Sequence, residues 1–283
     1  MTKPEGRPSP GSSPSILAVC GKWAKEASVA ASHLLFPPAC LVCGLELPAA
    51  PPGASLERWL AERICSACEL DLGISGGRCS HCGLPSPGGS DCVGCRQLRG
   101  RLHLSVLPWQ QLFVLGGYAD RLRDMVLQAK RPAGEDRAEL LAMLLLRQHG
   151  QLAEICLDAV VPVPMHWRRR LARGTNAASV IAKRLAWQLG VPQKNALQRK
   201  RLTPLQRSLP AAERPGNVAG SFRLRGRQPP GRQVLLVDDV ATTGATFAAA
   251  ATALLEAGVS VVYAAAVARA DMTPAPNNPD SLP

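Results

Sequence analysis

Residues 234–246 read Val-Leu-Leu-Val-Asp-Asp-Val-Ala-Thr-Thr-Gly-Ala-Thr, and they constrain the fold more than any other stretch of this 283-residue chain. Four apolar residues predict a buried strand, and the small residues around Gly244 predict a tight turn into a helix over 246–256. A second apolar, β-branched run follows at 259–267. Strand, helix and strand in this order predict an α/β fold with a mostly parallel sheet.

Shorter periodic segments extend this pattern toward the amino terminus. The apolar run 159–163 predicts a short buried strand. Helical spacing occurs at 120–129, 136–148 and 177–189. We therefore place an α/β domain over 105–270, followed by a disordered tail over 271–283 in which Pro, Asn and Asp dominate. Residues 1–36 predict a disordered leader with one short amphipathic helix.

Asp238 and Asp239 follow the strand at its carboxyl end, where open α/β sheets bind ligands. Paired carboxylates there can accept hydrogen bonds from vicinal ribose hydroxyls and contact Mg²⁺ through water. We expect both to be exposed and to contribute little to folding. Small residues next to them let N–H groups and a helix start cradle a phosphate. The alternative is a buried strand whose Asp caps a helix. The candidate site is Asp238, Asp239, Val240, Ala241, Thr242, Thr243, Gly244, Ala245 and Thr246.

Eight of the ten cysteines form four Cys-x-x-Cys pairs. Each pair can present two thiolates to one Zn²⁺ at about 2.3 Å, and two pairs close a tetrahedral structural site. The chain therefore predicts two structural zinc ions in a module over 37–100. Disulfides, an iron–sulfur cluster and a redox dithiol are the alternatives. The expected ligands are Cys40, Cys43, Cys65, Cys68, Cys79, Cys82, Cys92 and Cys95.

An internal repeat bears on how the four pairs combine. Residues 40–48 and 79–87 both begin Cys-x-x-Cys-Gly-Leu and end in Pro. Two successive zinc ribbons are the simplest interpretation, each built from two consecutive pairs, although a crossed pairing stays open. His81 is expected at the surface, whereas Cys20 and Cys156 are expected to be buried as small apolar side chains.

Positive charge is concentrated in one part of the chain. The net charge is +12, yet residues 160–233 hold 16 Lys and Arg against one acid, Glu213. Such a block predicts a polyanion as partner, either a pyrophosphate-bearing small molecule or a nucleic acid. The alternative is a solvated basic face.

The segment 234–246 resembles the phosphoribosyl-pyrophosphate signature of type I phosphoribosyltransferases. Further stretches narrow the resemblance to the ComF family, the ComFC- and GntX-like proteins that join a double zinc ribbon to such a domain. These stretches are Val-Pro-Val-Pro-Met-His at 161–166, Arg173-Gly174 with Asn176, and the spaced residues Thr203, Gln206, Leu209, Arg214, Asn217, Gly220 and Phe222. The resemblance covers about 36–269 and implies that phosphoribosyl pyrophosphate and Mg²⁺ bind at Asp238 and Asp239.

The resemblance also implies two basic elements around the ligand. A loop facing the pyrophosphate would hold His166, Arg168, Arg169, Arg170 and Arg173, and a mobile hood would include Arg207 and Arg214. For any one arginine of the loop, a place in a surface charge cluster is the alternative.

Three positions depart from the patterns of related proteins. The family's Arg-Gly-Phe-Asn-Gln appears at 173–177 as Arg-Gly-Thr-Asn-Ala, which argues against base stacking at Thr175. Its Lys-Tyr-Arg-Gly appears at 130–134 as Lys-Arg-Pro-Ala-Gly, which argues against Lys130 as a site residue. Purine-type relatives carry a base-deprotonating Asp where this chain has Thr242, so no catalytic residue can be named.

Two functions follow as expectations. The first is a ComF-like protein of DNA uptake or utilisation that binds phosphoribosyl pyrophosphate and Mg²⁺, and single-stranded DNA weakly, with Trp167 as a stacking residue. It could also contact proteins of the DNA-uptake machinery. The second is an active phosphoribosyltransferase of nucleotide metabolism with an unknown acceptor. A transcription regulator is the third hypothesis. With no secretory signal and no apolar run long enough for a membrane span, the expected location is the cytoplasm.

Overall fold

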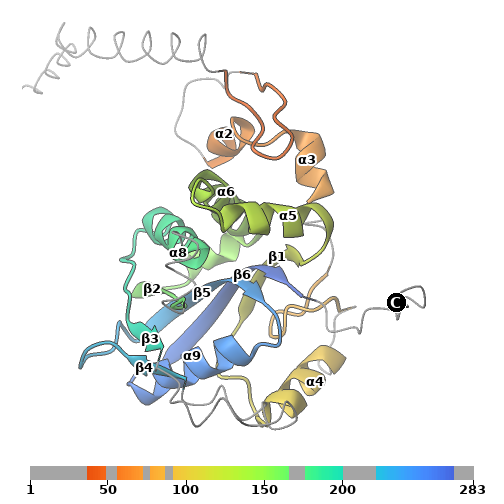
Figure 1. Cartoon of the computed structure of the whole chain (residues 1–283). Coiled ribbons are helices and arrows are strands. Elements are labelled where there is room, and N and C mark those ends of the chain that lie inside the picture. Colours follow the sequence, from red (N-terminus) through yellow and green to blue (C-terminus); the bar gives the residue numbers. More distant parts are fainter. Residues whose placement is uncertain are drawn as a thin grey trace, which may run out of the picture.

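The computed structural model describes residues 37–48, 56–72, 77–86, 92–165, 176–199 and 221–270. Within these residues a four-stranded sheet has the order β1-β6-β5-β2, and every neighbouring pair is parallel (Figure 1). The expected α/β fold with a parallel sheet is therefore confirmed. The strands are β1 (Leu112–Gly117), β2 (Ala159–Pro162), β5 (Gln233–Ala241) and β6 (Val261–Arg269).

Helices cover both faces of the sheet, as Figure 1 shows. On one face lie α5 (Asp120–Ala129), α6 (Glu135–Gln148) and α8 (Ala177–Gln188), and on the other lies α9 (Ala245–Glu256). Every residue from Leu140 to Leu146 in α6 is buried. A helix that is apolar on all sides belongs in the interior, and here α6 contacts both β1 and α8.

Strand β5 joins the two halves of the core. Leu235 and Val237 belong to the cluster on the α6 side, whereas Val234 and Leu236 belong to the cluster on the α9 side. Successive side chains of a strand point to opposite faces, so a strand buried on both faces has to be apolar at every position. The apolar run stops at Asp238, where the strand approaches the carboxyl edge of the sheet, the edge at which open α/β sheets generally bind ligands.

The first cysteine ribbon packs against the helices on the α6 side. It comprises residues 37–48, α2 (Leu56–Ala61) and α3 (Ser66–Asp71), and its buried Leu47, Leu60 and Leu72 join the cluster of α5, α6 and α8. The Arg184 guanidinium of α8 lies 4.6 Å from the centre of the Trp59 ring of α2. The ribbon is thus fixed to helices rather than to strands.

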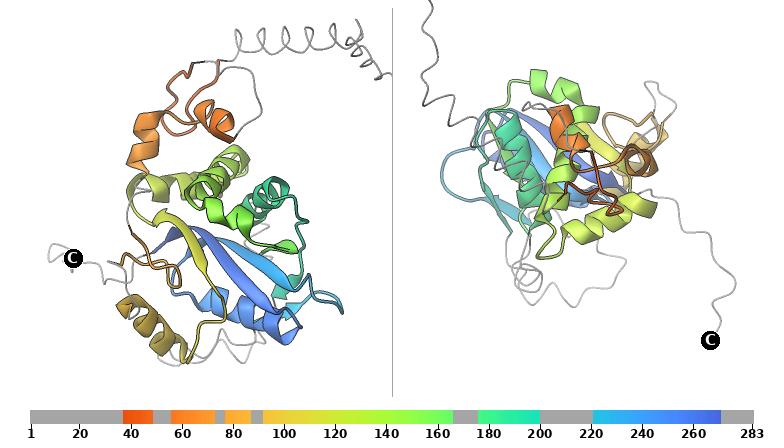
Figure 2. Two further views of the ribbon diagram at one scale, coloured as in Figure 1. Left: turned by 180° about the vertical axis from the view of Figure 1, so that it is seen from behind. Right: turned by 90° about the horizontal axis from the view of Figure 1, so that it is seen from above.

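The second ribbon lies on the opposite face of the sheet (Figure 2). It comprises residues 77–86 and α4 (Val93–Leu102), and its buried Leu84 and Leu98 join the cluster that includes α9. The Leu112 N–H donates to the Ser80 carbonyl at 2.7 Å, which ties this ribbon to the start of β1. The two ribbons therefore cover different faces of one sheet.

The remaining described elements are a short antiparallel pair, β3 (Leu197–Arg199) with β4 (Phe222–Leu224), and the 3₁₀ helix η1 (Gly150–Glu154). The expected amphipathic helix near the amino terminus lies outside the described residues. In the described parts of the chain, no helix has both the length and the apolar character that a membrane crossing requires.

Candidate functional site

The acid pair lies near the carboxyl end of β5 and has a basic neighbour. Lys130, which directly follows α5, places its Nζ 3.0 Å from Oδ1 of Asp239, and the two side chains are 17% and 16% exposed. Asp238 is also half-buried, and its Oδ1 accepts the Asp239 N–H at 2.9 Å. The carboxylates are therefore less exposed than the sequence predicts. Lys130 lies beside them, although its sequence context argues against a place in the site.

Asp238 has an unusual protonation equilibrium. Burial raises its pKa to about 8, and the charge of Asp239 acts in the same direction. The Asp239 N–H, Lys130 and Arg199 oppose this rise without cancelling it. Two adjacent carboxyl groups cannot both ionise cheaply in a low-dielectric site. The pair therefore retains a proton at neutral pH, and a ligand that supplies hydrogen-bond donors or a cation would favour its release.

Replacing Asp238 by Asn should stabilise the unliganded protein at alkaline pH. A solvated Asp has a pKa of about 3.9. Because the folded pKa is raised, the folded state binds more protons than the unfolded state between these two values, and the free energy of unfolding falls as pH rises through that window. Asn is neutral throughout. We expect melting curves to show a gain of roughly 2–4 °C per kcal/mol recovered.

Asp158 is the matched control. Its carboxylate accepts the N–H groups of Gln233 and Arg232, which lowers its pKa. Asp158→Asn should therefore shift stability the other way, with a loss at neutral pH that disappears as pH falls. An Asp238→Asn profile that runs parallel to that of the wild type would contradict the raised pKa.

The turn between β5 and α9 has the features of a phosphate cradle. Gly244 adopts φ 75°, in the left-handed region, and caps the amino end of α9. Thr242 and Thr243 are exposed, and Thr243 Oγ1 accepts the Ala245 N–H at 3.4 Å. Helix starts present N–H groups to anions, and the two hydroxyls lie at the same edge as the acid pair. This edge therefore carries the kinds of donor and acceptor that a phosphate and sugar hydroxyls require.

Gly244 is also constrained by α4, which packs against the turn. A Cβ at this position would lie 2.9 Å from Cδ1 of Leu98 in α4. Gly244→Val would therefore strain the backbone and displace Leu98 even without a ligand. Gly244→Val therefore cannot be used to test the approach of a phosphate in isolation.

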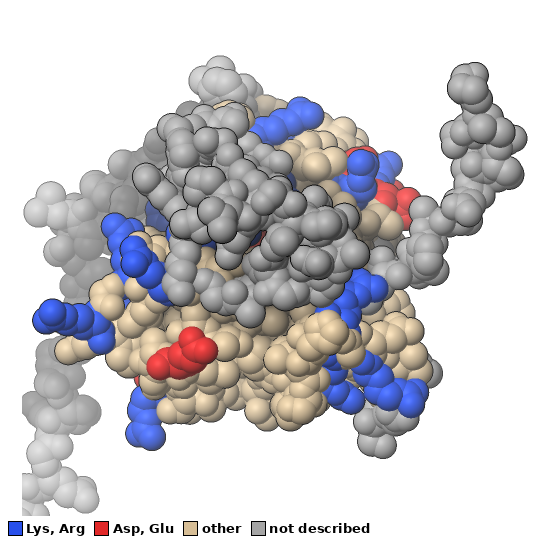
Figure 3. Space-filling view, turned by 60° about the horizontal axis from the view of Figure 1, so that its bottom comes forward, with Lys and Arg blue, Asp and Glu red and all other residues tan. Residues whose placement is uncertain are grey.

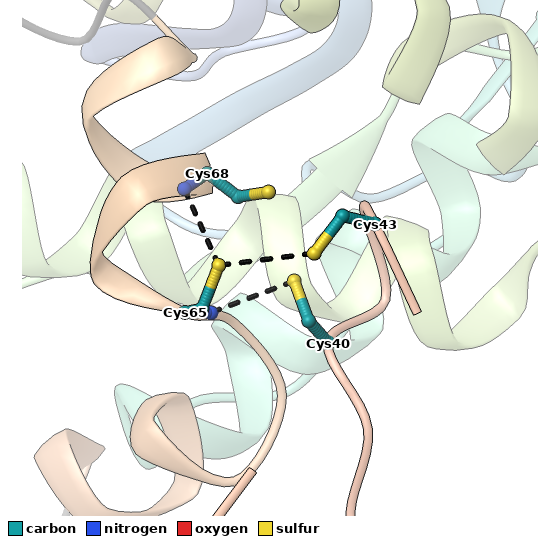
Figure 4. Close-up of side chains that lie close together, drawn as sticks. All are labelled: Cys40, Cys43, Cys65 and Cys68. Carbon is teal, nitrogen blue, oxygen red and sulfur yellow. Dashed lines mark hydrogen bonds between the residues drawn. The ribbon is translucent and has the colours of Figure 1, made fainter. Parts of the chain in front are cut away.

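The eight paired cysteines gather into two groups. In each group the four Sγ atoms lie within 4.8 Å of one another, and Figure 4 shows those of the first group pointing toward a common centre. Cys43 and Cys65 have their Sγ atoms 3.9 Å apart, and the pairs Cys79–Cys95 and Cys82–Cys92 are at 3.5 and 3.7 Å. Thiolates bound at about 2.3 Å to a tetrahedral Zn²⁺ lie about 3.8 Å apart. The structure thus shows the sequential grouping and not the crossed one.

Hydrogen bonds from the backbone favour the thiolate form of one cysteine in each ribbon. Burial opposes ionisation of Cys40, but the N–H groups of Cys43, Cys65 and Val42 outweigh it and lower its pKa to about 6. Burial likewise opposes ionisation of Cys92, yet hydrogen bonds lower its pKa to about 7. Burial raises the pKa of Cys68 in the first group and of Cys95 in the second. Each group thus combines one readily ionised thiol with neighbours that keep their protons, and a divalent cation bound by four thiolates would replace those protons.

The structure also tests the expected exposure of His81 and the expected burial of the unpaired cysteines. His81 is exposed, as expected. Cys156 is exposed as well, so its expected burial is wrong. All nine described cysteines are free of disulfides. Cys20 lies outside the described residues.

The two basic elements cannot be placed around the acid pair. Among the described cations of the basic block, Arg199 is close enough to Asp238 to lower its pKa. Figure 3 shows several Lys and Arg side chains spread around the face that carries α9, with few acids among them. The following predicted residues lie outside the described part of the chain: His166, Trp167, Arg168, Arg169, Arg170, Arg173, Arg207 and Arg214.

Comparison with known proteins agrees with this architecture. The phosphoribosyl transferase domain family matches residues 171–280. "DNA utilization protein YhgH" from Salmonella typhi is 32% identical over 234 residues, which cover 81% of this chain and 96% of that protein. "Competence protein F" from Haemophilus influenzae is 29% identical, covering 73% and 90%. "Competence protein ComFC" from Bacillus subtilis is 27% identical, covering 70% and 80%. With two four-cysteine groups joined to a phosphoribosyltransferase-type sheet, this chain belongs to the ComF family.

Proposed function

We propose that this protein binds phosphoribosyl pyrophosphate with Mg²⁺ at the carboxyl edge of the sheet and acts in DNA utilisation or uptake. One observation carries the proposal: Lys130, the acid pair and the exposed threonines of the cradle occupy the ends of neighbouring elements at this edge. Carboxylates suit the ribose hydroxyls, and N–H groups at a helix start suit a phosphate. The names of the relatives supply the DNA-related role.

Each part of the site would have its own task. Asp238 and Asp239 would accept hydrogen bonds from the two ribose hydroxyls, while the 242–246 turn would hold the 5′-phosphate. Lys130 offsets the charge of Asp239 and orients it before a ligand arrives. Bound Mg²⁺ would neutralise the pyrophosphate group. The pair would lose its retained proton as it becomes an acceptor.

A thermal-shift experiment tests this proposal. Ligand at a hundred times its dissociation constant should stabilise the protein by roughly 2.7 kcal/mol. Phosphoribosyl pyrophosphate with Mg²⁺ should therefore raise the melting temperature clearly, and ribose 5-phosphate or pyrophosphate alone should raise it less. Equal shifts for all three compounds would indicate a general anion site instead of the proposed one.

The two four-cysteine groups are proposed to hold one structural Zn²⁺ each. Four thiolates leave no open position on a tetrahedral ion, so these sites would stabilise the fold and take no part in chemistry.

Single-stranded DNA is the second ligand we propose, because the basic block also contains Arg223, Arg225 and Arg227, which are all exposed. Phosphate contacts of this kind give weak binding that is independent of sequence and falls steeply with salt.

Neutralising Arg168, Arg169 and Arg170 together to Gln should weaken DNA binding and flatten its salt dependence, as measured by fluorescence anisotropy over a salt series. Arg96, Arg99 and Arg101 of α4 lie outside the block and provide the matched triple control. Equal losses in both triples would show that net charge alone, and not this loop, is responsible.

Transfer of the phosphoribosyl group is the alternative function. Thr242 is exposed in the cradle at the position where purine-type enzymes carry a general base, so this position offers no group to activate an acceptor. Pyrophosphate release across a panel of nucleobases would reveal such an activity. We expect none above the rate of spontaneous hydrolysis.

A further inference from the structure

Arg269 is the last residue of β6, and it is completely buried. Its Nε donates to the Cys82 carbonyl at 2.9 Å, and its Nη1 donates to the Ala241 carbonyl at 2.8 Å. Cys82 belongs to the second four-cysteine group, and Ala241 directly precedes the exposed threonines of the cradle. One side chain therefore joins a cysteine knuckle to the start of the candidate phosphate loop.

The geometry of this link is well defined. A guanidinium is planar and carries its donors in a fixed fork, so two simultaneous hydrogen bonds hold both acceptors in one relative position. The Ala241 carbonyl also accepts the Ala270 N–H at 2.9 Å, within the β5–β6 pairing. The backbone that enters the loop is thus held by the sheet and by the arginine together.

Two further contacts connect the second ribbon to the same turn. Leu98 of α4, three residues after Cys95, packs so closely against Gly244 that no Cβ fits between them. Trp109 donates its indole N–H to the His81 carbonyl at 2.7 Å, and its ring meets Phe247 edge-on with centroids 6.3 Å apart. Ala241 at the start of the loop is therefore bonded to Arg269, which is itself bonded to the ribbon. Gly244 within the loop contacts Leu98 of the ribbon, and the helix that follows contacts Trp109, which is bonded to the ribbon.

The first ribbon provides a natural contrast. Its described contacts run to the helices on the other face, through the ion pair of Glu69 with Arg147 and the stacking of Arg184 on Trp59. Its buried residues share a cluster with α5, α6 and α8. The two ribbons have the same ligand set, but among the described residues only the second contacts Gly244 directly and is joined to Ala241 through Arg269.

We propose that Arg269 is a positioning residue that makes the second ribbon part of the ligand site, so that metal binding there fixes the conformation of the 242–246 loop. The first ribbon stabilises the protein without this effect. The role in ligand affinity rests on the proposed binding of phosphoribosyl pyrophosphate, whereas the effect on the loop does not.

Four single variants of the full chain test the proposal: Cys43→Ser in the first group, Cys92→Ser in the second, Arg269→Met and Arg269→Lys. Amide hydrogen exchange of the 242–246 loop is the main measurement, because it needs no ligand. Zinc content and the dissociation constant for phosphoribosyl pyrophosphate with Mg²⁺ are measured beside it. Melting temperatures report the general loss of stability that any of these changes could cause.

Cys92→Ser should lose one metal and exchange faster in the loop, whereas Cys43→Ser should lose one metal and leave the loop unchanged. Arg269→Met should keep both metals and still exchange faster, and Arg269→Lys should recover part of the protection with its single ammonium group. Ligand affinity should fall by about tenfold in Cys92→Ser and Arg269→Met, within the range usual for coupled sites.

The outcomes separate the two claims. Unchanged loop exchange in Cys92→Ser and Arg269→Met, or an equal increase in Cys43→Ser, overturns the positioning role whether or not the ligand binds. A wild-type protein that shows the predicted exchange pattern but no ligand binding refutes the proposed function alone.

Discussion

Elemental analysis of the purified chain should give two zinc ions per molecule, and each cysteine group should account for one of them. Replacing Cys40 by Ser should remove only the first metal, and replacing Cys79 by Ser only the second, because the structure separates the groups onto opposite faces of the sheet. Only the ribbon that loses its metal should unfold, because structural zinc binding in small peptides contributes roughly 10–16 kcal/mol to the folding of the site itself. Zinc analysis together with circular dichroism would measure both consequences.

Two other results would contradict this expectation. Iron instead of zinc would indicate an iron–sulfur cluster, and loss of both metals from either single variant would mean that the ribbons fold as one unit. The exposed Cys156 offers a matched control, because Cys156→Ser removes a thiol outside both groups. It should leave two zinc ions and an unchanged melting curve.

The combined replacement Asp238→Asn and Asp239→Asn should abolish binding of phosphoribosyl pyrophosphate. A hydrogen bond to a charged acceptor contributes roughly 1.5–3 kcal/mol, so losing two should weaken affinity by more than about a hundredfold. The neutral amides would also leave Lys130 without its partner carboxylate. We expect these substitutions to change the stability of the fold, so the melting curve of the unliganded variant has to be measured as well.

Asp124→Asn with Asp136→Asn replaces the same number of carboxyl groups at exposed positions on α5 and α6 and serves as the control. It should bind like the wild type. If both double variants lose affinity equally, the loss reflects net charge and the acid pair is not the ribose site.

The central half of the sheet is accessible from sequence because its signals are local. β5, the turn at Gly244 and α9 follow from one apolar run, one glycine and one alanine-rich helix, and the helix was predicted within one residue of its observed start. The repeat favours the sequential cysteine grouping, since chain segments that share a turn motif form equivalent knuckles, and the structure excludes the crossed pairing that the repeat leaves open. These features need no knowledge of which segments meet in space.

Features that depend on distant contacts were not predicted. α4 is basic, contains two glycines and buries only Cys95 and Leu98, so its helical period is faint. Lys130 meets Asp239 from an element more than a hundred residues away, and no local pattern marks that pairing. One feature of the sequence could have drawn attention to Arg269, because it is a charged residue at the end of an otherwise apolar strand. Its hydrogen bonds to the Cys82 and Ala241 carbonyls can be recognised only from the three-dimensional structure, in which the second ribbon packs against the sheet.

Isothermal titration of the wild-type chain with phosphoribosyl pyrophosphate tests the central claim most directly, because it reports affinity and stoichiometry without a label. We expect saturable binding of one ligand per chain in the presence of Mg²⁺ and much weaker binding when Mg²⁺ is omitted. The absence of any binding heat with Mg²⁺ present, up to millimolar ligand and at two temperatures, would contradict the assignment of this edge of the sheet as the ligand site.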